Sequence, residues 1–287
     1  MSLLFRQLTI CGVGLIGGSL ALTARKHRLV ERIVGLGRTQ ANLDLALERG
    51  LIDFATRDPA EAAHGASLVM LATPVMTFPA TLAAMVPFLP LDAVVTDVGS
   101  VKSWVVGQLE PLLKEGMSFV GVHPIAGKET TGAIAAEEDL FRNRRVIVTP
   151  SKLSTAEAVA KVEALWRATG ARIETMAPRV HDAILARASH LPQVVASALG
   201  CALADEIVDG RLAAAFGAGG LRDTTRIAGS SPEMWRDICL TNAEAIGTAL
   251  KLYRQWFDRF EEAVVMKDER ALNQLFNQGR RIRERME

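Results

Sequence analysis

The sequence has 287 residues, of which 49% are hydrophobic, so it has enough apolar material for the cores of one large domain or two ordinary ones. Its 33 basic and 32 acidic side chains nearly cancel and only 5% of residues are aromatic, which argues against a nucleic-acid or general polyanion binder. The three cysteines lie far apart without metal-ligand spacing, so we expect a reducing compartment, the cytoplasm by default, and no metal site.

Short β-branched runs alternate with amphipathic stretches in the first part of the chain, which is typical of a parallel sheet with crossover helices. Several of these runs, such as LVMLA and AVVTDV, are nearly continuous apolar segments, as expected of strands buried on both faces. We therefore predict a Rossmann-like α/β domain with a mostly parallel sheet over residues 1–177. Its predicted strands are Gln7–Cys11, Arg32–Leu36, Leu68–Ala72, Ala93–Asp97, Ser118–Val122, Arg145–Val148 and Arg172–Thr175.

The pattern changes after Pro178, where strand-like runs give way to long helical ones, so we predict an all-α domain over residues 178–287. The stretch that begins at Val180 is rich in Ala, Leu and Val on nearly every side, and we expect it to be buried against other helices. Pro192 cannot donate to the carbonyl of Ala188, which predicts a kink there. The predicted helices are Val180–Val208, Arg211–Phe216, Pro232–Val265 and Glu269–Met286.

A GxGxxG motif made of Gly12, Gly14 and Gly17 follows the first predicted strand and opens a helix. Gly12 permits a tight turn, Gly14 lets the backbone approach a pyrophosphate, and Gly17 lets helix and strand pack closely. We expect Leu15 and Ile16 to share in binding a dinucleotide, because a helix N-terminus offers free N–H groups to phosphates. The alternative is a tight turn without a ligand. A strand, turn and helix explain this low-charge segment better than a membrane span or a signal peptide does.

The end of the second predicted strand bears on the choice of cofactor. An acidic residue there would bind the ribose 2′-hydroxyl of NAD, but this chain has Gly37, Arg38 and Thr39. Arg38 can pair with a 2′-phosphate and Thr39 can donate a hydrogen bond to it. We therefore favour NADP over NAD. The alternative, in which NAD remains possible, is that Arg38 is a surface arginine stacked on the adenine.

Polar residues also follow two later strands, at the sheet edge where ligands of such folds bind. Ser100 lies in the segment DVGSVK, where it either caps the next helix or presents its hydroxyl to a site. His123 lies in HPIAGKE, on a loop constrained by a proline and a glycine. A histidine suits acid–base work near neutrality, although it could equally be a loop residue bonded to backbone.

The helical part carries two further polar groups of residues. His190 and Gln193 flank the predicted kink, which either exposes them to a cleft or serves packing alone. Arg222 and Arg226 follow a glycine-rich loop, which suggests an anion site.

Six segments together resemble the prephenate/arogenate dehydrogenase family: GVGLIGGSLA, ATPV, DVGSVK, HPIAGKETTG, SHLPQ and LRDTTRIAGSSPEMWRDI. They occur in the family's order and cover most of residues 7–240. The resemblance implies NAD(P)-dependent oxidative decarboxylation of prephenate or arogenate in tyrosine biosynthesis, without a metal. It also implies a homodimer formed through the helical domain, and it suggests neither a nucleic-acid partner nor a membrane.

The resemblance also implies roles for individual residues. His123 matches the base that takes the substrate hydroxyl proton, Ser100 the serine that hydrogen-bonds beside it, and Arg226 the arginine that holds a substrate carboxylate. Other matching positions are His190 and Trp235 in the substrate pocket and Thr73 and Pro74 in the loop that covers the cofactor.

Position 193 departs from the family pattern. Prephenate-specific members often read SHLPH, whereas this chain has Gln193, whose amide can both accept and donate, and this favours arogenate or both substrates. Two other hypotheses stay open. A related β-hydroxyacid or imine reductase would rely on a lysine of the helical domain, but Lys251 and Lys267 lie in no motif. A silent NADP-binding sensor would have lost the base, yet His123 is present.

Overall fold

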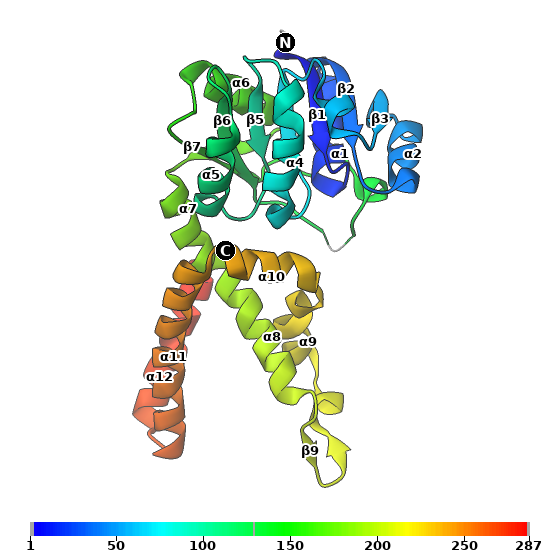
Figure 1. Ribbon diagram of the computed structural model, residues 1–287. Helices are drawn as coiled ribbons and strands as arrows, with labels where there is room; N and C mark the ends of the chain where they lie inside the picture. The colour runs from blue at the N-terminus through cyan, green and yellow to red at the C-terminus, as the bar shows by residue number, and fades with distance from the viewer. Residues whose placement is uncertain (1–2, 129, 286–287) are drawn as a thin grey trace.

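The computed structural model describes residues 3–128 and 130–285. Figure 1 shows an α/β domain above a helical part, whose two arms diverge away from the sheet. Glu129, which belongs to the HPIAGKETTG motif, and Met286, the predicted end of the last helix, lie outside the described residues. The fold class is confirmed as a Rossmann-like α/β domain followed by a helical one.

The sheet has eight strands in the order β3-β2-β1-β4-β5-β6-β7-β8. Neighbouring strands are parallel except for the antiparallel pair β6 and β7. All seven predicted strands are present, with ends within two residues of their predicted positions, but the three-residue edge strand β3 was missed. The strands are β1 (Phe5–Cys11), β2 (Val30–Leu36), β3 (Phe54–Thr56), β4 (Leu68–Leu71), β5 (Val94–Asp97), β6 (Ser118–Pro124), β7 (Arg145–Pro150) and β8 (Arg172–Thr175).

Two apolar cores cover the two faces of this sheet. Leu68 and Met70 of β4 point into one core and Val69 and Leu71 into the other, which explains why this strand is apolar at every position. The first core is completed by α1 (Leu15–Lys26), α2 (Gln40–Glu48) and α6 (Ala156–Arg167). The second core is completed by α3 (Pro59–Ala63), α4 (Phe78–Met85) and α5 (Ser103–Leu109).

The helical part departs from its predicted boundaries in three places. The helix predicted over Pro232–Val265 is divided at Asn242, whose backbone is not helical, into two helices. The long helix expected to reach Val208 ends at Leu203, and residues 207–212 form an antiparallel hairpin of β9 (Ile207–Val208) and β10 (Arg211–Leu212). Asp209 and Gly210 at its turn both have positive φ, as this tight turn requires. The predicted helix Arg211–Phe216 was therefore wrong at Arg211 and Leu212, and its remaining residues, Ala213–Phe216, form a 3₁₀ helix. The helices are α7 (Pro178–Leu185), α8 (Leu191–Leu203), α9 (Gly219–Thr225), α10 (Pro232–Thr241), α11 (Ala243–Val265) and α12 (Glu269–Glu284).

The distortion predicted at Pro192 takes the form of a π-helical turn, Ala186–His190, between α7 and α8. A wider turn accommodates the proline that follows it, and such turns are frequent at functional sites. It brings His190 to a buried position. The expected burial of the whole segment is not found within one chain, because only Gln193 and Ala196 of α8 are buried.

Candidate active site

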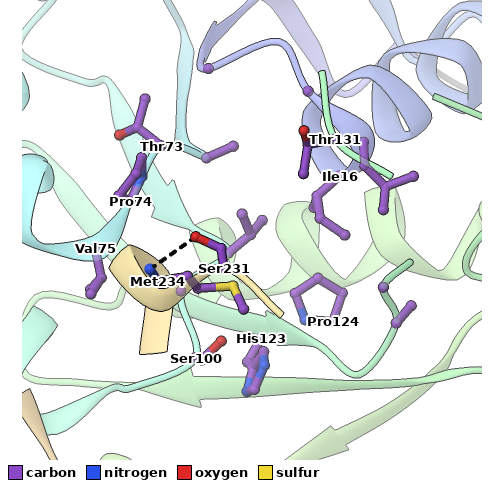
Figure 2. A pocket seen from close by; sticks show the side chains of 18 of the residues that line it. Ile16, Thr73, Pro74, Val75, Ser100, His123, Pro124, Thr131, Ser231 and Met234 are labelled. Carbon is purple, nitrogen blue, oxygen red and sulfur yellow. Dashed lines mark hydrogen bonds between the residues drawn. The ribbon is translucent and has the colours of Figure 1, made fainter. Parts of the chain in front are cut away.

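A cleft of about 2320 Å³ opens along the carboxyl edge of the sheet, and residues of both domains line it. Figure 2 draws Ser100, His123 and Pro124 from the ends of strands together with Ser231 and Met234 from the start of α10. Pockets for small ligands usually measure roughly 300–1,000 Å³. This cleft therefore has room for a dinucleotide and a small substrate together.

The glycine turn forms one end of the cleft. Gly12 has a φ of +97°, and a Cβ there would lie 2.8 Å from the carbonyl oxygen of Ala72, so only glycine fits. A Cβ on Gly17 would meet Ile10 at 2.7 Å, which is the close helix–strand packing that the motif predicts. Gly12, Gly14, Leu15 and Ile16 line the cleft, whereas Gly17 does not.

The first turn of α1 is suited to a phosphate. Its N-cap is Gly14, which has no side chain to occupy the free N–H groups, and a Cβ on Gly14 would have nothing nearer than 3.9 Å. The backbone is therefore open toward the cleft, where a pyrophosphate would meet N–H groups and the positive end of the helix dipole. These features fit a bound dinucleotide.

Gly37, Arg38 and Thr39, which are predicted to bind the adenosine end of the cofactor, also line the cleft. The structure adds Arg57, which sequence reasoning missed because it missed β3. Leu36 pairs with Thr56, so Arg38 and Arg57 lie just beyond the ends of neighbouring strands. Of the described lining residues that follow β2 and β3, none is a carboxylate, and the carboxylates of the cleft, Glu137, Asp139 and Glu174, come from segments after β6.

Ser100 lies on the cleft wall and does not cap the following helix. That helix, α5, begins at Ser103, and Asp182 of α7 accepts hydrogen bonds from the backbone N–H groups of Lys102 and Ser103, both at 2.8 Å. The capping alternative for Ser100 is therefore wrong, and its hydroxyl is placed with Thr73 and Pro74 on the lining of the cleft.

His123 lies near the end of β6, where it pairs with Ile147 of β7. Its partly buried ring lines the cleft. Its Nδ1 lies 2.8 Å from Nε2 of His181. Burial lowers the pKa of His123 well below 6.5, and the repulsion that a protonated His123 would meet from the Lys102 ammonium and from protonated forms of His181 and His190 lowers it further. The imidazole is therefore held neutral, which is the state that a proton acceptor needs.

A fully buried ion pair lies beneath Ser100 and His123. Asp97, at the end of β5, accepts hydrogen bonds from Lys102 Nζ, from Gly99 N at 2.8 Å and from Val122 N at 3.2 Å. Lys102 Nζ also donates to the Val122 carbonyl at 2.7 Å. Burial raises the pKa of Asp97 and lowers that of Lys102, and each group opposes the shift of the other. The pair thus ties β6 to the loop that carries Ser100.

The helical domain contributes His190, Arg226 and Trp235 to the cleft. The rings of His190 and Trp235 meet edge to face at 6.0 Å, and Nδ1 of His190 lies 3.2 Å from the Asn242 amide nitrogen. Burial and, to a smaller extent, repulsion between the protonated forms of His190 and His181 lower the pKa of His190 to about 4. His190 therefore enters the cleft as a neutral ring.

Two predicted residues of the helical domain are not on the cleft wall. Gln193 is buried, and its side-chain amide donates to the carbonyl of Ile227 at 2.9 Å. Arg222 is exposed on α9, so Arg226 alone of the two predicted anion-binding arginines lines the cleft.

Within residues 3–128 and 130–285, no three His, Cys, Asp or Glu side chains are grouped so as to hold a metal ion. No helix in that part of the chain is both long enough and apolar enough to cross a membrane.

Comparison with known proteins assigns both parts of the chain. Residues 20–175 match the family model described as prephenate dehydrogenase, nucleotide-binding domain, and residues 177–278 match prephenate dehydrogenase, dimerization domain. The chain belongs to the prephenate dehydrogenase family. One similar member of this family is the prephenate dehydrogenase of Bacillus subtilis, 34% identical over 96% of this chain and 74% of the relative.

Solved structures of the family agree with this fold. Prephenate dehydrogenase from Aquifex aeolicus, in complex with hydroxyphenyl propionate and NAD+, is 33% identical, covers 100% of both chains and superposes with a TM-score of 0.94. Arogenate dehydrogenase from Synechocystis is 32% identical, with 98% of this chain and 100% of that chain covered and a TM-score of 0.83. Enzymes of this family thus include relatives named for either of two substrates.

The buried ion pair makes a prediction about stability. We expect Lys102→Met to lower the free energy of unfolding by about 3–5 kcal/mol, because it leaves the Asp97 carboxylate buried without its counter-charge. Chemical denaturation measures this loss. Adding Asp97→Asn removes the stranded charge and should recover part of the stability. If the losses from the two substitutions simply add, the two charges do not compensate each other.

Proposed function

We propose that the chain is an NAD(P)-dependent dehydrogenase that converts prephenate to 4-hydroxyphenylpyruvate, arogenate to tyrosine, or both, with loss of CO₂. The observation that carries the proposal is the position of His123, whose partly buried ring shares one cleft with Ser100, the glycine turn and Arg226. Membership of the prephenate dehydrogenase family supports an oxidoreductase with a nicotinamide cofactor.

His123 serves as the base in this proposal. The hydroxyl proton of the substrate ring passes to the imidazole of His123, and Ser100 hydrogen-bonds to the same oxygen as the carbonyl forms. A nicotinamide held in the cleft would supply the acceptor for the hydride that leaves the carbon bearing this hydroxyl. The bond between the ring and the carboxylate then breaks, its electron pair enters the ring, and CO₂ leaves as the ring becomes aromatic and its oxygen regains a proton. This sequence needs no metal.

Arg226 holds a substrate carboxylate in this proposal, since a guanidinium matches a carboxylate with two parallel hydrogen bonds. His190 and Trp235 line the cleft as a neutral aromatic edge suited to the substrate ring. The preference for arogenate rested on Gln193, whose amide bonds to Ile227 and does not line the cleft. We therefore propose both substrates without ranking them.

The cofactor proposal favours NADP, with NAD also accepted. Two cations, Arg38 and Arg57, line the adenosine end, and no carboxylate among the described lining residues would repel a 2′-phosphate there. Thr39 lies beside them as a neutral donor. Thr73 and Pro74, which line the same cleft, would help to hold the nicotinamide end of the cofactor.

We also propose a division into a dinucleotide-binding domain, residues 1–177, and a helical substrate and dimerisation domain, residues 178–287. A homodimer through the second domain is supported by the family description of that region as a dimerization domain. It is further supported by large apolar side chains of α11 and α12 that one chain leaves exposed, among them Leu252, Phe257 and Phe276.

Neither alternative function gains support. Lys251 and Lys267, the lysines that a β-hydroxyacid or imine reductase would need, do not line the cleft. A silent sensor does not need a neutral histidine and a serine at the point where a hydride would leave.

Turnover tests the proposal directly. We expect absorbance at 340 nm to rise when the enzyme is mixed with NADP+ or NAD+ and either prephenate or arogenate, and absence of turnover with both substrates would refute it.

His123→Asn should lower kcat about 10²–10⁴-fold and leave cofactor affinity within about 3-fold, because it removes a base and no cofactor contact. His64→Asn, at an exposed histidine outside the cleft, is the matched control.

Cofactor choice is tested by charge. We expect Arg38→Asp to shift the ratio of kcat/KM for NADP+ over NAD+ toward NAD+ by about tenfold or more, because a carboxylate repels the 2′-phosphate and can bind a 2′-hydroxyl. Arg57→Ala should shift the ratio in the same direction by less. Arg6→Asp repeats the charge reversal outside the cleft and should leave the ratio unchanged. An unchanged ratio in both cleft variants would show that neither arginine contacts the phosphate.

A further inference from the structure

His123 is the first of three hydrogen-bonded side chains that extend away from the cleft. Its Nδ1 lies 2.8 Å from Nε2 of His181, and Nδ1 of His181 lies 2.8 Å from Oδ1 of Asp182. The side chain of His181 is completely buried and that of Asp182 is 7% exposed, so bulk water does not compete for these hydrogen bonds. Both residues belong to α7, whereas His123 belongs to β6.

The Asp182 carboxylate, at the far end, determines which nitrogen carries the proton in each of these hydrogen bonds. Burial raises the pKa of Asp182, but hydrogen bonds from His181 and from the Ser103 and Lys102 N–H groups outweigh it, so Asp182 is an ionised carboxylate that only accepts. Nδ1 of His181 must therefore carry the proton of its bond to Asp182. Burial lowers the pKa of His181, and the neutral ring then has its lone pair at Nε2.

The same reasoning continues to His123. Because Nε2 of His181 is an acceptor, Nδ1 of His123 must donate to it. A neutral His123 then has its one lone pair on Nε2. In water a free imidazole favours the opposite tautomer, with the proton on Nε2, which would leave no acceptor on that nitrogen for a substrate proton.

We propose that His181 and Asp182 are positioning residues that hold His123 in the tautomer whose Nε2 accepts the substrate proton. This inference rests on the proposed function of His123 as the base. When His123 takes up the proton, the positive charge of its imidazolium is balanced through His181 by the Asp182 carboxylate. Asp182 also accepts from the first N–H groups of α5, so the same carboxylate orients the base and anchors the loop that carries Ser100.

A purely structural role is the competing explanation, since these bonds also join α7 to β6 and to α5. The two explanations differ in what a neutral carboxamide does. In Asp182→Asn the side-chain NH₂ can donate to Nδ1 of His181, which moves the His181 proton to Nε2, turns Nδ1 of His123 into an acceptor and puts a proton on its Nε2. The side-chain volume is nearly unchanged, but Lys102 N–H loses its acceptor where the NH₂ faces His181, and the carboxylate charge behind the base is gone.

The first test measures tautomer and turnover in the full-length protein. ¹⁵N NMR of histidine-labelled enzyme, in which only five histidines contribute, should show neutral His123 protonated at Nδ1, with the signal assigned by its loss in His123→Asn. Asp182→Asn should move that proton to Nε2 and lower kcat about 10²-fold or more, with KM within about 3-fold. Asp53→Asn removes a carboxylate that likewise accepts a backbone N–H, but outside the cleft, and should change neither value.

A second pair of variants keeps the proposal testable if Asp182→Asn fails to fold. His181→Gln places an amide oxygen near the former Nε2 and can still accept from His123, so it should keep the His123 tautomer and retain kcat within about tenfold. His181→Asn places its amide near the former Nδ1, can donate to Asp182 and leaves His123 without an acceptor. It should therefore lose at least ten times more kcat than His181→Gln does, at similar melting temperatures.

Three results would overturn the positioning role: an Nε2-protonated His123 in the unmodified enzyme, a kcat within about 3-fold of normal in folded Asp182→Asn, or equal losses in the two His181 variants. Failure of the proposed function looks different. In that case the unmodified enzyme turns over neither substrate, while the NMR spectrum still reports the tautomer.

Discussion

The buried ion pair between Asp97 and Lys102 is the interaction on which the arrangement of the cleft depends. It joins β5 to β6, and the backbone N–H of the same lysine is held by Asp182 of the helical domain. Burying two charges costs several kcal/mol per ion, and only good geometry with additional hydrogen bonds offsets this cost. Here Asp97 has three hydrogen-bond donors and the Lys102 ammonium has two acceptors, so the pair fixes geometry more than it adds stability.

The same pair shapes the electrostatics of the cleft. The Lys102 ammonium and two neighbouring histidines face His123, and burial together with these groups lowers its pKa. Neutral imidazoles are thereby favoured in a region that already has one buried cation. The proposed acid–base role of His123, the proposed tautomer control through Asp182 and the anchoring of the loop with Ser100 all depend on one compact set of contacts between β5, β6, α5 and α7.

Local patterns predicted most of the fold and the cleft. The seven strands were recognisable because both faces of the sheet are buried, and the glycine turn because close backbone approach permits no Cβ at Gly12. The short edge strand β3 was missed, since three residues carry too little periodicity, and Arg57 was missed with it. The hairpin after α8 was mistaken for helix although Asp209-Gly210 is a turn signal.

Other features depend on tertiary contacts that no local pattern records. Gln193 lies near the predicted kink, yet its direction is set by the carbonyl of Ile227 on another segment. The pairing of His181 with His123 spans 58 positions, and the His-Asp dipeptide of α7 belongs to no recognisable motif. The roles of Asp97 and Lys102 could not be predicted either, because only the folded chain shows that these first and last residues of the segment DVGSVK form an ion pair.

The central claim is that these contacts hold His123 as a neutral base, and the pH dependence of kcat/KM tests it most directly. The base works only when unprotonated, so activity is present above its pKa and is lost as pH falls through that value. His181, His190 and Lys102 oppose protonation, whereas Asp182 and Asp97 lie behind them as the balancing carboxylates. The account predicts an acid limb well below pH 6.5 that disappears in His123→Asn. An acid limb at or above pH 6.5 that titrates with His123 would contradict it.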